Sequence, residues 1–283
     1  MKIRSCEKGY AGQSVAKKNV TARRGSEGGS TAEFHSASDG RRPKSLRDFC
    51  GAAPPQTFGC RSLKEQEKKM KYKYIMWEWN GTILDDLQIN FEIENTLLSR
   101  RGKKTMSEIG EYHEKFGFPI ISFYEKLGFD LENERFEDIA RDYVFEYDER
   151  FPEAEIFEDA ERALREFKFA GIRQMILSAT EQRFLEKQVR AHDIEHFFTD
   201  ILGTGDVYAK SKVDIALRWI SENDVDCAEV LFVGDTTHDF EVAENIGCDC
   251  ILIARGHNSY ETLAATGVTV LENIEELRRL VLR

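Results

Sequence analysis

The fold of this chain is decided by the stretch Tyr72-Lys73-Tyr74-Ile75-Met76-Trp77-Glu78-Trp79-Asn80-Gly81-Thr82. The residues from Tyr72 to Trp79 form an apolar, aromatic run with the length of one β-strand. A carboxylate, Glu78, lies at the end of this run, and a Gly-Thr pair follows it. Gly81 permits a tight turn that brings backbone N–H groups towards an anion, although an ordinary Asn-Gly turn is the alternative. The stretch therefore predicts a buried strand with a polar site at its end.

Apolar runs of similar length recur along the chain, and segments with helical periodicity separate them. Short apolar strands that alternate with helices are typical of βαβ units and of a parallel sheet. We therefore predict a Rossmann-like α/β domain from about residue 71 to the C-terminus. The expected strands are residues 74–77, 174–177, 200–202, 230–233 and 250–254, and the expected helices are residues 159–169, 181–191, 212–221, 239–246 and 274–282.

Residues 87–151 interrupt this alternation. They contain no convincing strand and show helical periodicity at residues 89–98, 120–127 and 136–145. Roughly 65 residues are too many for a connecting loop, so we predict a helical subdomain inserted after the first strand. Ligands of open α/β sheets bind beyond the carboxyl ends of the strands, and an insertion there would cover the site as a lid. The predicted core comprises residues 70–86 and 152–283, and the predicted cap comprises residues 87–151.

Residues 1–69 differ from the rest of the chain. They hold three of the five prolines, many Gly and Ser residues and no sustained hydrophobic period. Such a segment cannot bury enough apolar surface to offset the entropy that is lost on ordering. We predict a disordered basic tail, and the alternative explanation is a mis-assigned start, with Met70 as the true first residue.

Charge and hydropathy exclude several kinds of partner. Residues 1–72 contain 16 basic and 7 acidic residues, whereas the remainder contains 24 basic and 44 acidic residues. An acidic folded part argues against nucleic-acid binding, because phosphate neutralisation needs clustered Lys and Arg. No apolar run approaches the roughly 18 residues of a membrane span, and the N-terminus lacks the apolar region of a secretory signal. We expect a cytoplasmic protein, with Cys248 and Cys250 as buried structural residues in a reducing compartment.

A second carboxylate pattern follows the apolar run 230–233 and has the sequence Gly234-Asp235-Thr236-Thr237-His238-Asp239. Its two carboxylates, four residues apart, straddle an expected strand end and helix start. This spacing suits Mg²⁺, which prefers carboxylate oxygens together with waters and substrate phosphate. The alternative is an Asp N-cap followed by a first-turn Asp that complements the helix dipole.

Two further polar groups lie between these carboxylate patterns. Ser178 follows an expected strand and precedes a helix, where its hydroxyl could hydrogen-bond a phosphoryl oxygen or cap the helix. Lys210 and Lys212 precede the helix expected at residues 212–221. Either lysine could neutralise a nucleophile and its substrate, and a solvated surface lysine is the alternative for each.

Together these features occur in the order carboxylate-x-x-Gly-Thr, Ser, Lys, Gly-Asp-x-x-x-Asp, each at an expected strand end. The arrangement resembles the haloacid dehalogenase (HAD) superfamily of phosphatases. It is specifically similar to the phosphoglycolate-phosphatase-like branch, whose members carry a helical cap inserted after the first strand. The resemblance extends over residues 72–282 and includes the cap phrases Phe118-Pro119 and residues 123–130.

This resemblance implies a role for each site residue. The family motif is Asp-x-Asp-Gly-Thr, in which the first Asp attacks phosphorus and the second Asp moves a proton; the corresponding residues here are Glu78 and Asn80. The implied catalytic lysine is Lys212, which fits a Ser-Lys-Val phrase, or Lys210, which has the common spacing of four residues before Asp214. The implied phosphate-binding residues are Gly81, Thr82, Ser178 and Ala179, and the implied Mg²⁺ ligands are Glu78, the Asn80 carbonyl, Asp235 and Asp239.

Both catalytic positions depart from the family pattern. The extra methylene of Glu78 displaces its carboxylate by on the order of 1 Å, and such a shift can cost about 10²-fold in rate. The amide of Asn80 cannot transfer a proton, a function worth about 10²–10⁴-fold. We predict a Mg²⁺-dependent phosphatase of a small phosphorylated metabolite, weakened by Glu78. The alternatives are a non-catalytic relative that binds a phosphate ligand and a haloacid-type dehalogenase, which the metal motif disfavours.

Overall fold

The computed structural model describes residues 70–205 and 212–283. The predictions made for residues 1–69, a disordered tail or a mis-assigned start, lie outside the described residues, and so does Lys210. No helix in the described part of the chain is long and apolar enough to cross a membrane.

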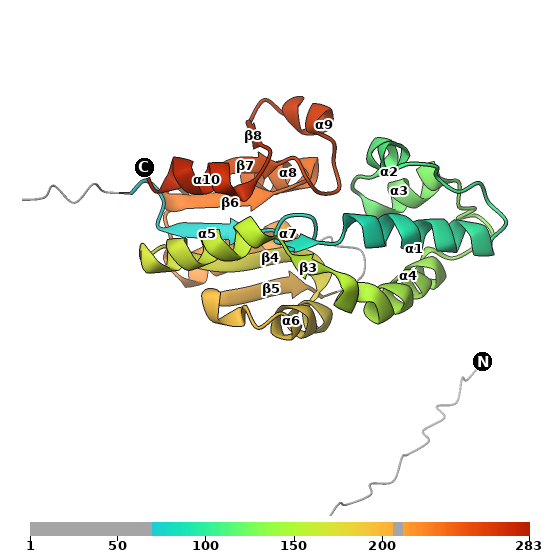
Figure 1. Ribbon diagram of the computed structural model, residues 1–283, viewed down its shortest axis with the longest axis horizontal. Helices are drawn as coiled ribbons and strands as arrows, with labels where there is room; N and C mark the ends of the chain where they lie inside the picture. The colour runs from blue at the N-terminus through green and yellow to red at the C-terminus, as the bar shows by residue number, and fades with distance from the viewer. Residues whose placement is uncertain (1–69, 206–211) are drawn as a thin grey trace, which may run out of the picture. The chain divides into compact units, whose positions relative to one another are not determined.

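A parallel sheet of six strands forms the centre of the described structure (Figure 1). The strand order is β5-β4-β1-β6-β7-β8, and every neighbouring pair is parallel. The chain moves outwards from β1 to β4 and β5, then crosses over to β6 and continues to β7 and β8, so the switch point lies beside β1. The strands are β1 (Tyr74–Trp77), β4 (Arg173–Glu181), β5 (Asp200–Thr204), β6 (Val230–Gly234), β7 (Asp249–Ile253) and β8 (Thr269–Leu271).

Side chains of β1 alternate between two apolar cores. Ile75 and Trp77 belong to one buried cluster, and Met76 belongs to the other. The first cluster includes residues of α5 (Glu158–Phe169), α6 (Gln182–Ala191) and α10 (Ile274–Val281), and the second includes residues of α7 (Lys212–Glu222) and α8 (Thr237–Ile246). Because helices cover both faces, the strands are continuously apolar rather than alternating. The predicted Rossmann-like α/β fold is confirmed.

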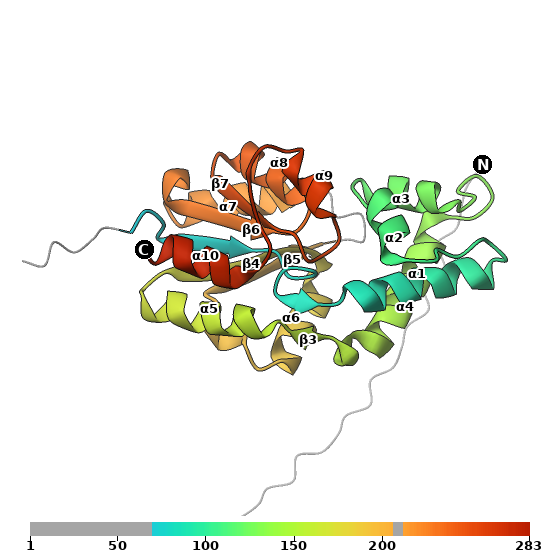
Figure 2. The same ribbon diagram turned by 45° about the horizontal axis from the view of Figure 1, so that its top comes forward.

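Four α-helices, α1 to α4, lie between β2 and β3 in the chain, on the side of the carboxyl ends of the strands of the sheet (Figures 1 and 2). The chain leaves the core before these helices and returns to it after them through a two-stranded antiparallel ribbon. In this ribbon Leu84 pairs with Ile156, and Asp85 pairs with Glu155. The elements are β2 (Leu84–Asp85), α1 (Leu87–Arg100), α2 (Ile109–Lys115), α3 (Ile120–Leu127), α4 (Phe136–Arg150), the 3₁₀ turn Phe151–Glu153 and β3 (Glu155–Ile156).

The structure also differs from the sequence-based expectations. Strand β4 continues to Glu181, four residues beyond the expected end, because Glu181 pairs with Thr204 of β5 after an irregularity in the register. Ser178 therefore lies within a strand rather than after it. The short elements β2, β3, β8, α2 and α9 (Tyr260–Ala264) were not anticipated. Cys248 and Cys250 are free and only partly buried.

Candidate active site

Glu78 lies directly after β1 and is only 6% exposed. Its backbone N–H donates to the Val233 carbonyl at 2.8 Å, which fixes it beside β6. The Ser178 hydroxyl donates to Glu78 Oε1 at 2.7 Å, and the Lys212 ammonium donates to Glu78 Oε2. Burial raises the pKa of the Glu78 carboxyl, and Lys212 opposes this shift. Three of the predicted site residues, one directly after β1, one in β4 and one in α7, therefore meet at the Glu78 carboxylate.

Asp239 holds Lys212 from the other side. Its Oδ1 accepts from Lys212 Nζ at 2.6 Å, and its Oδ2 accepts from the N–H groups of Asp235 and Thr236 at 3.1 and 3.0 Å. The Thr236 hydroxyl caps α8 and forms a capping box with Asp239. Burial disfavours the charged form of Asp239, but Lys212 and these donors hold its pKa below the usual range. Asp239 thus acts as a first-turn acid of α8, as in the alternative interpretation, and Thr236 rather than Asp235 is the N-cap.

Asp235 is enclosed by the loop that follows β1 and by the loop that follows β7. Its Oδ1 accepts from the Thr82 hydroxyl at 2.7 Å, and its Oδ2 accepts from the His257 backbone N–H at 2.7 Å. A Cβ on Gly81, which has φ +68°, would lie 2.4 Å from Asp235 Oδ2, so this close approach requires glycine. Burial raises the pKa of Asp235 to about 7. The carboxylate is therefore held tightly against backbone on two sides.

Both the nitrogen and the oxygen of the Asn80 side-chain amide form hydrogen bonds. Its Nδ2 donates to Asp86 Oδ2 at 2.7 Å and to the Tyr147 hydroxyl at 2.8 Å, while its Oδ1 accepts from the Thr180 hydroxyl at 2.8 Å. Asp86 also accepts from the Gly81 N–H at 2.9 Å. Asn80 is thus held as a donor towards a buried carboxylate, so the residue at this position is an amide for a structural reason.

Sequence reasoning missed Asp86 and His257 as members of the site. Burial disfavours ionisation of Asp86, but donors from His257, Tyr147 and Asn80 hold its pKa below the usual range. His257 Nε2 lies 3.6 Å from Asp86 Oδ1, and its Nδ1 lies 3.0 Å from the Tyr112 hydroxyl. Burial opposes protonation of His257, but Asp86 and other nearby carboxylates raise its pKa to about 9. The signal for His257 was its place after β7, since ligands bind beyond the carboxyl ends of strands.

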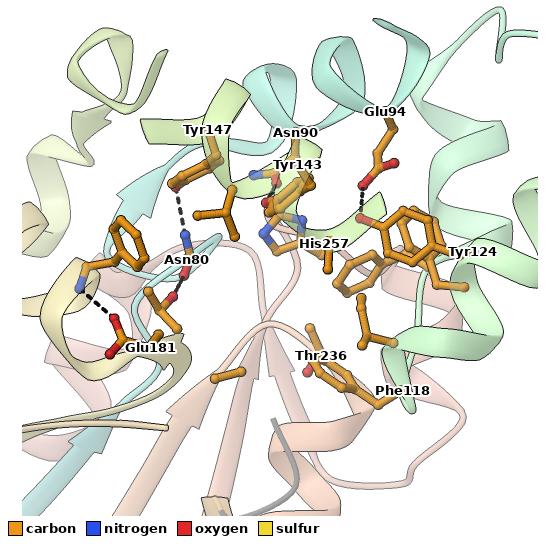
Figure 3. A pocket seen from close by; sticks show the side chains of 18 of the residues that line it. Asn80, Asn90, Glu94, Phe118, Tyr124, Tyr143, Tyr147, Glu181, Thr236 and His257 are labelled. Carbon is orange, nitrogen blue, oxygen red and sulfur yellow. Dashed lines mark hydrogen bonds between the residues drawn. The ribbon is translucent and has the colours of Figure 1, made fainter. Parts of the chain in front are cut away.

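A cavity of about 410 Å³ connects these core residues to the inserted helices (Figure 3). Glu78, Asn80, Lys212 and Asp235 line it from the core, and so does Ala179 of β4, while aromatic side chains of the inserted helices line it from the other side. Two tyrosines extend from those helices into the polar network, Tyr147 towards Asp86 and Tyr112 towards His257. The carboxylate–lysine centre thus faces this cavity.

The oxygen donors in this cavity suit a hard divalent cation. Glu78 and Asp235 line the cavity, and the backbone carbonyl of Asn80 belongs to the same loop as Glu78. The described residues contain no group of three or more His, Cys, Asp or Glu side chains arranged to hold a metal ion. Mg²⁺ does not require one, because it is usually bound through one or two carboxylates, waters and substrate phosphate. Each carboxylate oxygen of Glu78 and Asp235 accepts from one protein donor. Asp239 is less suited, because its Oδ2 accepts from three protein donors and its Oδ1 accepts from Lys212.

Comparison with known proteins identifies the family. A family model described as "Haloacid dehalogenase-like hydrolase" matches residues 75–253. The chain belongs to the haloacid dehalogenase-like hydrolases. The resemblance predicted from the sequence is therefore confirmed, and the matched region contains both the Glu78 motif and the Asp235 motif of this HAD-like hydrolase.

Its curated relatives include phosphoglycolate phosphatases. The one from Vibrio parahaemolyticus is 29% identical over 129 residues, which are 44% of this chain and 56% of the relative. The one from Photobacterium profundum is 21% identical over 208 residues, which are 70% of this chain and 90% of the relative. This HAD-like hydrolase spans about half the length of the first curated relatives that it matches.

Solved structures share the fold. A haloacid dehalogenase-like family hydrolase from Streptococcus pneumoniae superposes with a TM-score of 0.64 at 18% identity, and the match covers 73% of this chain and 97% of the other. At this identity the likeness concerns the arrangement of the elements alone. The side chains of the HAD-like hydrolase described above must therefore carry the argument for its chemistry.

Proposed function

We propose that this HAD-like hydrolase cleaves a small phosphomonoester and that Glu78 is its nucleophile. The observation that carries the proposal is the position of the Glu78 carboxylate, held between the Ser178 hydroxyl and the Lys212 ammonium where β1 ends and the cavity begins. A carboxylate at a strand end, next to a buried cation and a hydroxyl, is suited to covalent catalysis of phosphoryl transfer. The phosphoglycolate phosphatases among the relatives support this class of substrate.

The proposed reaction has two steps. A Glu78 oxygen forms a bond to phosphorus, and the bond from phosphorus to the leaving-group oxygen breaks. Water then cleaves the acyl phosphate, which releases inorganic phosphate and restores the Glu78 carboxylate. Lys212 offsets the negative charge that Glu78 and the phosphoryl group bring together. Glu78, Asp235 and the Asn80 carbonyl would hold Mg²⁺, which, when bound, supplies further positive charge next to the phosphoryl oxygens.

The inserted helices α1–α4 would act as the cap of this site. Tyr147 of α4 reaches Asp86, Tyr112 of α2 reaches His257, and His113 Nε2 lies 3.0 Å from the Gly256 carbonyl. These contacts place α2 and α4 over the loops that carry the core residues. Helices in such a position exclude water from the cavity and select the leaving group.

A non-catalytic role as a phosphate-ligand-binding protein is the second candidate. It is favoured by the amide of Asn80, which cannot move a proton, and by the extra methylene of Glu78. Carbon–halogen hydrolysis, which also uses a strand-end carboxylate, has less support, because the buried Asp235 suits a metal site that this reaction does not need.

One experiment separates these functions. Hydrolysis of p-nitrophenyl phosphate with Mg²⁺ is measured for the native protein, Glu78→Asp and Glu78→Ala, with Glu241→Ala on the exposed face of α8 as the control. We expect Glu78→Ala to lose the native activity and Glu78→Asp to exceed it by about 10²-fold, because the shorter side chain restores the in-line geometry. Native activity equal to that of Glu78→Ala would refute the phosphatase proposal.

A further inference from the structure

The cavity at Glu78 has a wall that is rich in apolar side chains. Several of them are only partly buried, so that part of their surface can be reached by a ligand: Phe116, Phe118, Ile120, Val144 and Phe184. They come from the segment between α2 and α3, from α3, from α4 and from α6. None of them takes part in the reaction described above. This wall is therefore available to contact the leaving group of the substrate.

Packing holds the rings of this wall in place. Phe116 stacks on the ring of His257 with 4.9 Å between the ring centroids, and Phe118 stacks on the ring of His238 at 4.3 Å. Figure 3 shows Phe118 across the cavity from Asn80. Because these rings are positioned before a ligand enters, they form a preformed surface, which binds an apolar group at a low cost in conformational entropy.

Positive charge in the cavity is already paired. Among the described residues that line it, those with a basic side chain are Arg141, Lys212 and His257. The Arg141 guanidinium is exposed and pairs with Asp138 at 2.6 Å. His257 Nε2 lies 3.6 Å from Asp86 Oδ1. Lys212 is held between two carboxylates and is needed at the phosphoryl group. A second anionic group on the substrate would therefore find no unpaired cation among these residues.

Acidic side chains make the cavity still less suitable for a second anionic group. Glu137, Asp148 and Glu181 also line it. A leaving group with its own carboxylate, such as that of phosphoglycolate, would lose hydration there without gaining a positive partner. An uncharged apolar leaving group loses little hydration and gains contact with the apolar wall.

We propose that the substrate is the phosphate ester of an uncharged aromatic alcohol, whose ring contacts the apolar wall while the phosphoryl group meets Glu78. Aromatic rings suit this wall because they pack edge-on or offset against the rings of Phe116 and Phe118. The cavity of about 410 Å³ has the size of a small-molecule site, about 300–1,000 Å³. The inference rests on the proposed function for the reaction and names the class of substrate.

Two matched pairs of compounds test the proposal in the full-length protein with Mg²⁺. Benzyl phosphate and 2-phosphoglycolate carry a phenyl ring and a carboxylate, respectively, on the same methylene, and both release an alkoxide, so the missing proton transfer at Asn80 affects them alike. Benzylphosphonate and phosphonoacetate differ in the same way and cannot be hydrolysed. We expect kcat/KM to be at least about tenfold higher for benzyl phosphate than for 2-phosphoglycolate, and calorimetry to show at least about tenfold tighter binding of benzylphosphonate than of phosphonoacetate.

Two lysine variants of α4 test the wall itself. Val144 lines the cavity, whereas the next residue, Phe145, is 64% exposed and is not among the lining residues. Val144→Lys places a cation in the wall, so we expect the ratio of the two kcat/KM values to shift towards 2-phosphoglycolate by at least about tenfold. Phe145→Lys adds the same charge outside the cavity and should leave this ratio unchanged.

Equal kcat/KM values for the two esters, or phosphonoacetate binding as tightly as benzylphosphonate, would overturn the inference on native protein alone, whether or not Val144→Lys folds. An unchanged ratio in folded Val144→Lys would overturn it as well. Faster hydrolysis of 2-phosphoglycolate than of benzyl phosphate would refute this inference and leave the phosphatase proposal intact. Tighter binding of benzylphosphonate without hydrolysis of either ester would refute the phosphatase proposal alone.

Discussion

The side-chain amide of Asn80 donates a 2.7 Å hydrogen bond to Oδ2 of Asp86, a carboxylate that is 0% exposed. The same Asp86 carboxylate accepts from Gly81, Asn90 and Tyr147. An acid at position 80 would therefore face a second buried acid, and one of the two would have to take up a proton. The amide at the position of the family's second Asp is thus matched to Asp86, and the two residues have to be considered as a pair.

Exchange of the two side-chain types tests this pairing. We expect Asn80→Asp to lower the free energy of unfolding by about 1–3 kcal/mol, because a buried donor is replaced by an acceptor. The double variant Asn80→Asp/Asp86→Asn restores one donor and one acceptor and should recover much of this loss. Urea unfolding at neutral pH measures both. Additive losses in the double variant would show that the residues are not coupled.

The same double variant should change the dependence of the rate on the leaving group. Asn80 cannot protonate the departing oxygen, so the native protein should prefer p-nitrophenyl phosphate, whose leaving group needs no proton, to 2-glycerophosphate. A carboxyl at position 80 should raise the rate on 2-glycerophosphate by up to about 10²–10⁴-fold and the rate on the aryl ester much less. Steady-state kinetics with both substrates provide the comparison, and equal gains on the two esters would contradict the explanation.

Gly81 should tolerate no side chain. An added Cβ would lie 2.4 Å from Asp235 Oδ2, and φ is +68°. Gly102 has a similar φ of +63° but has nothing within 4 Å of an added Cβ. Both alanine variants carry the backbone strain, about 1–3 kcal/mol, and only Gly81→Ala adds the collision. Thermal unfolding should therefore show a clearly larger loss for Gly81→Ala, and equal losses would mean that Asp235 can move aside.

Glu94 should make stability depend on pH. Burial raises the pKa of this acid from 4.5 to about 8. Below pH 4.5 both the folded and the unfolded states hold the proton. Between pH 4.5 and about 8 only the folded state holds it, so stability falls as the pH rises and levels off above about pH 8. The groups that face Glu94 are Tyr112, Tyr124 and Tyr143, which stay neutral here because burial raises their pKa values, and Arg101, which stays charged.

Urea midpoints at pH 5 and pH 8 measure this dependence. We expect the decline between the two values to be smaller in Glu94→Gln than in the native protein, and to remain native-like in the control variant Glu125→Gln, which changes an exposed side chain of α3. Asp235 also titrates in this window, with a pKa of about 7, but it is common to all three proteins, so the difference between them isolates Glu94. An unchanged decline in Glu94→Gln would contradict the shift.

The sequence by itself determined the strands that are buried on both faces. Residues such as Ile75 and Met76 pack into different cores, so β1 and β6 are continuously apolar and can be recognised without a partner. The polar residues after these strands, Glu78 and Asp235, could be placed together for the same reason, because parallel strands end at one edge. The family followed from this order of strand-end residues.

Only the tertiary structure decided which polar groups meet. Lys212 reaches Glu78 across 134 positions of sequence, and His257 reaches Tyr112 across 145, so neither contact leaves a local pattern. The end of β4 depends on pairing with β5, which put Ser178 inside a strand. Asp86 lies close to Asn80 in the sequence, but its role in the site comes from the hydrogen bonds that side chains of α1 and α4 donate to it. A buried carboxylate needs such donors. Propensity and hydrophobic period describe single segments, whereas hydrogen-bond satisfaction in a buried site is a property of the assembled chain.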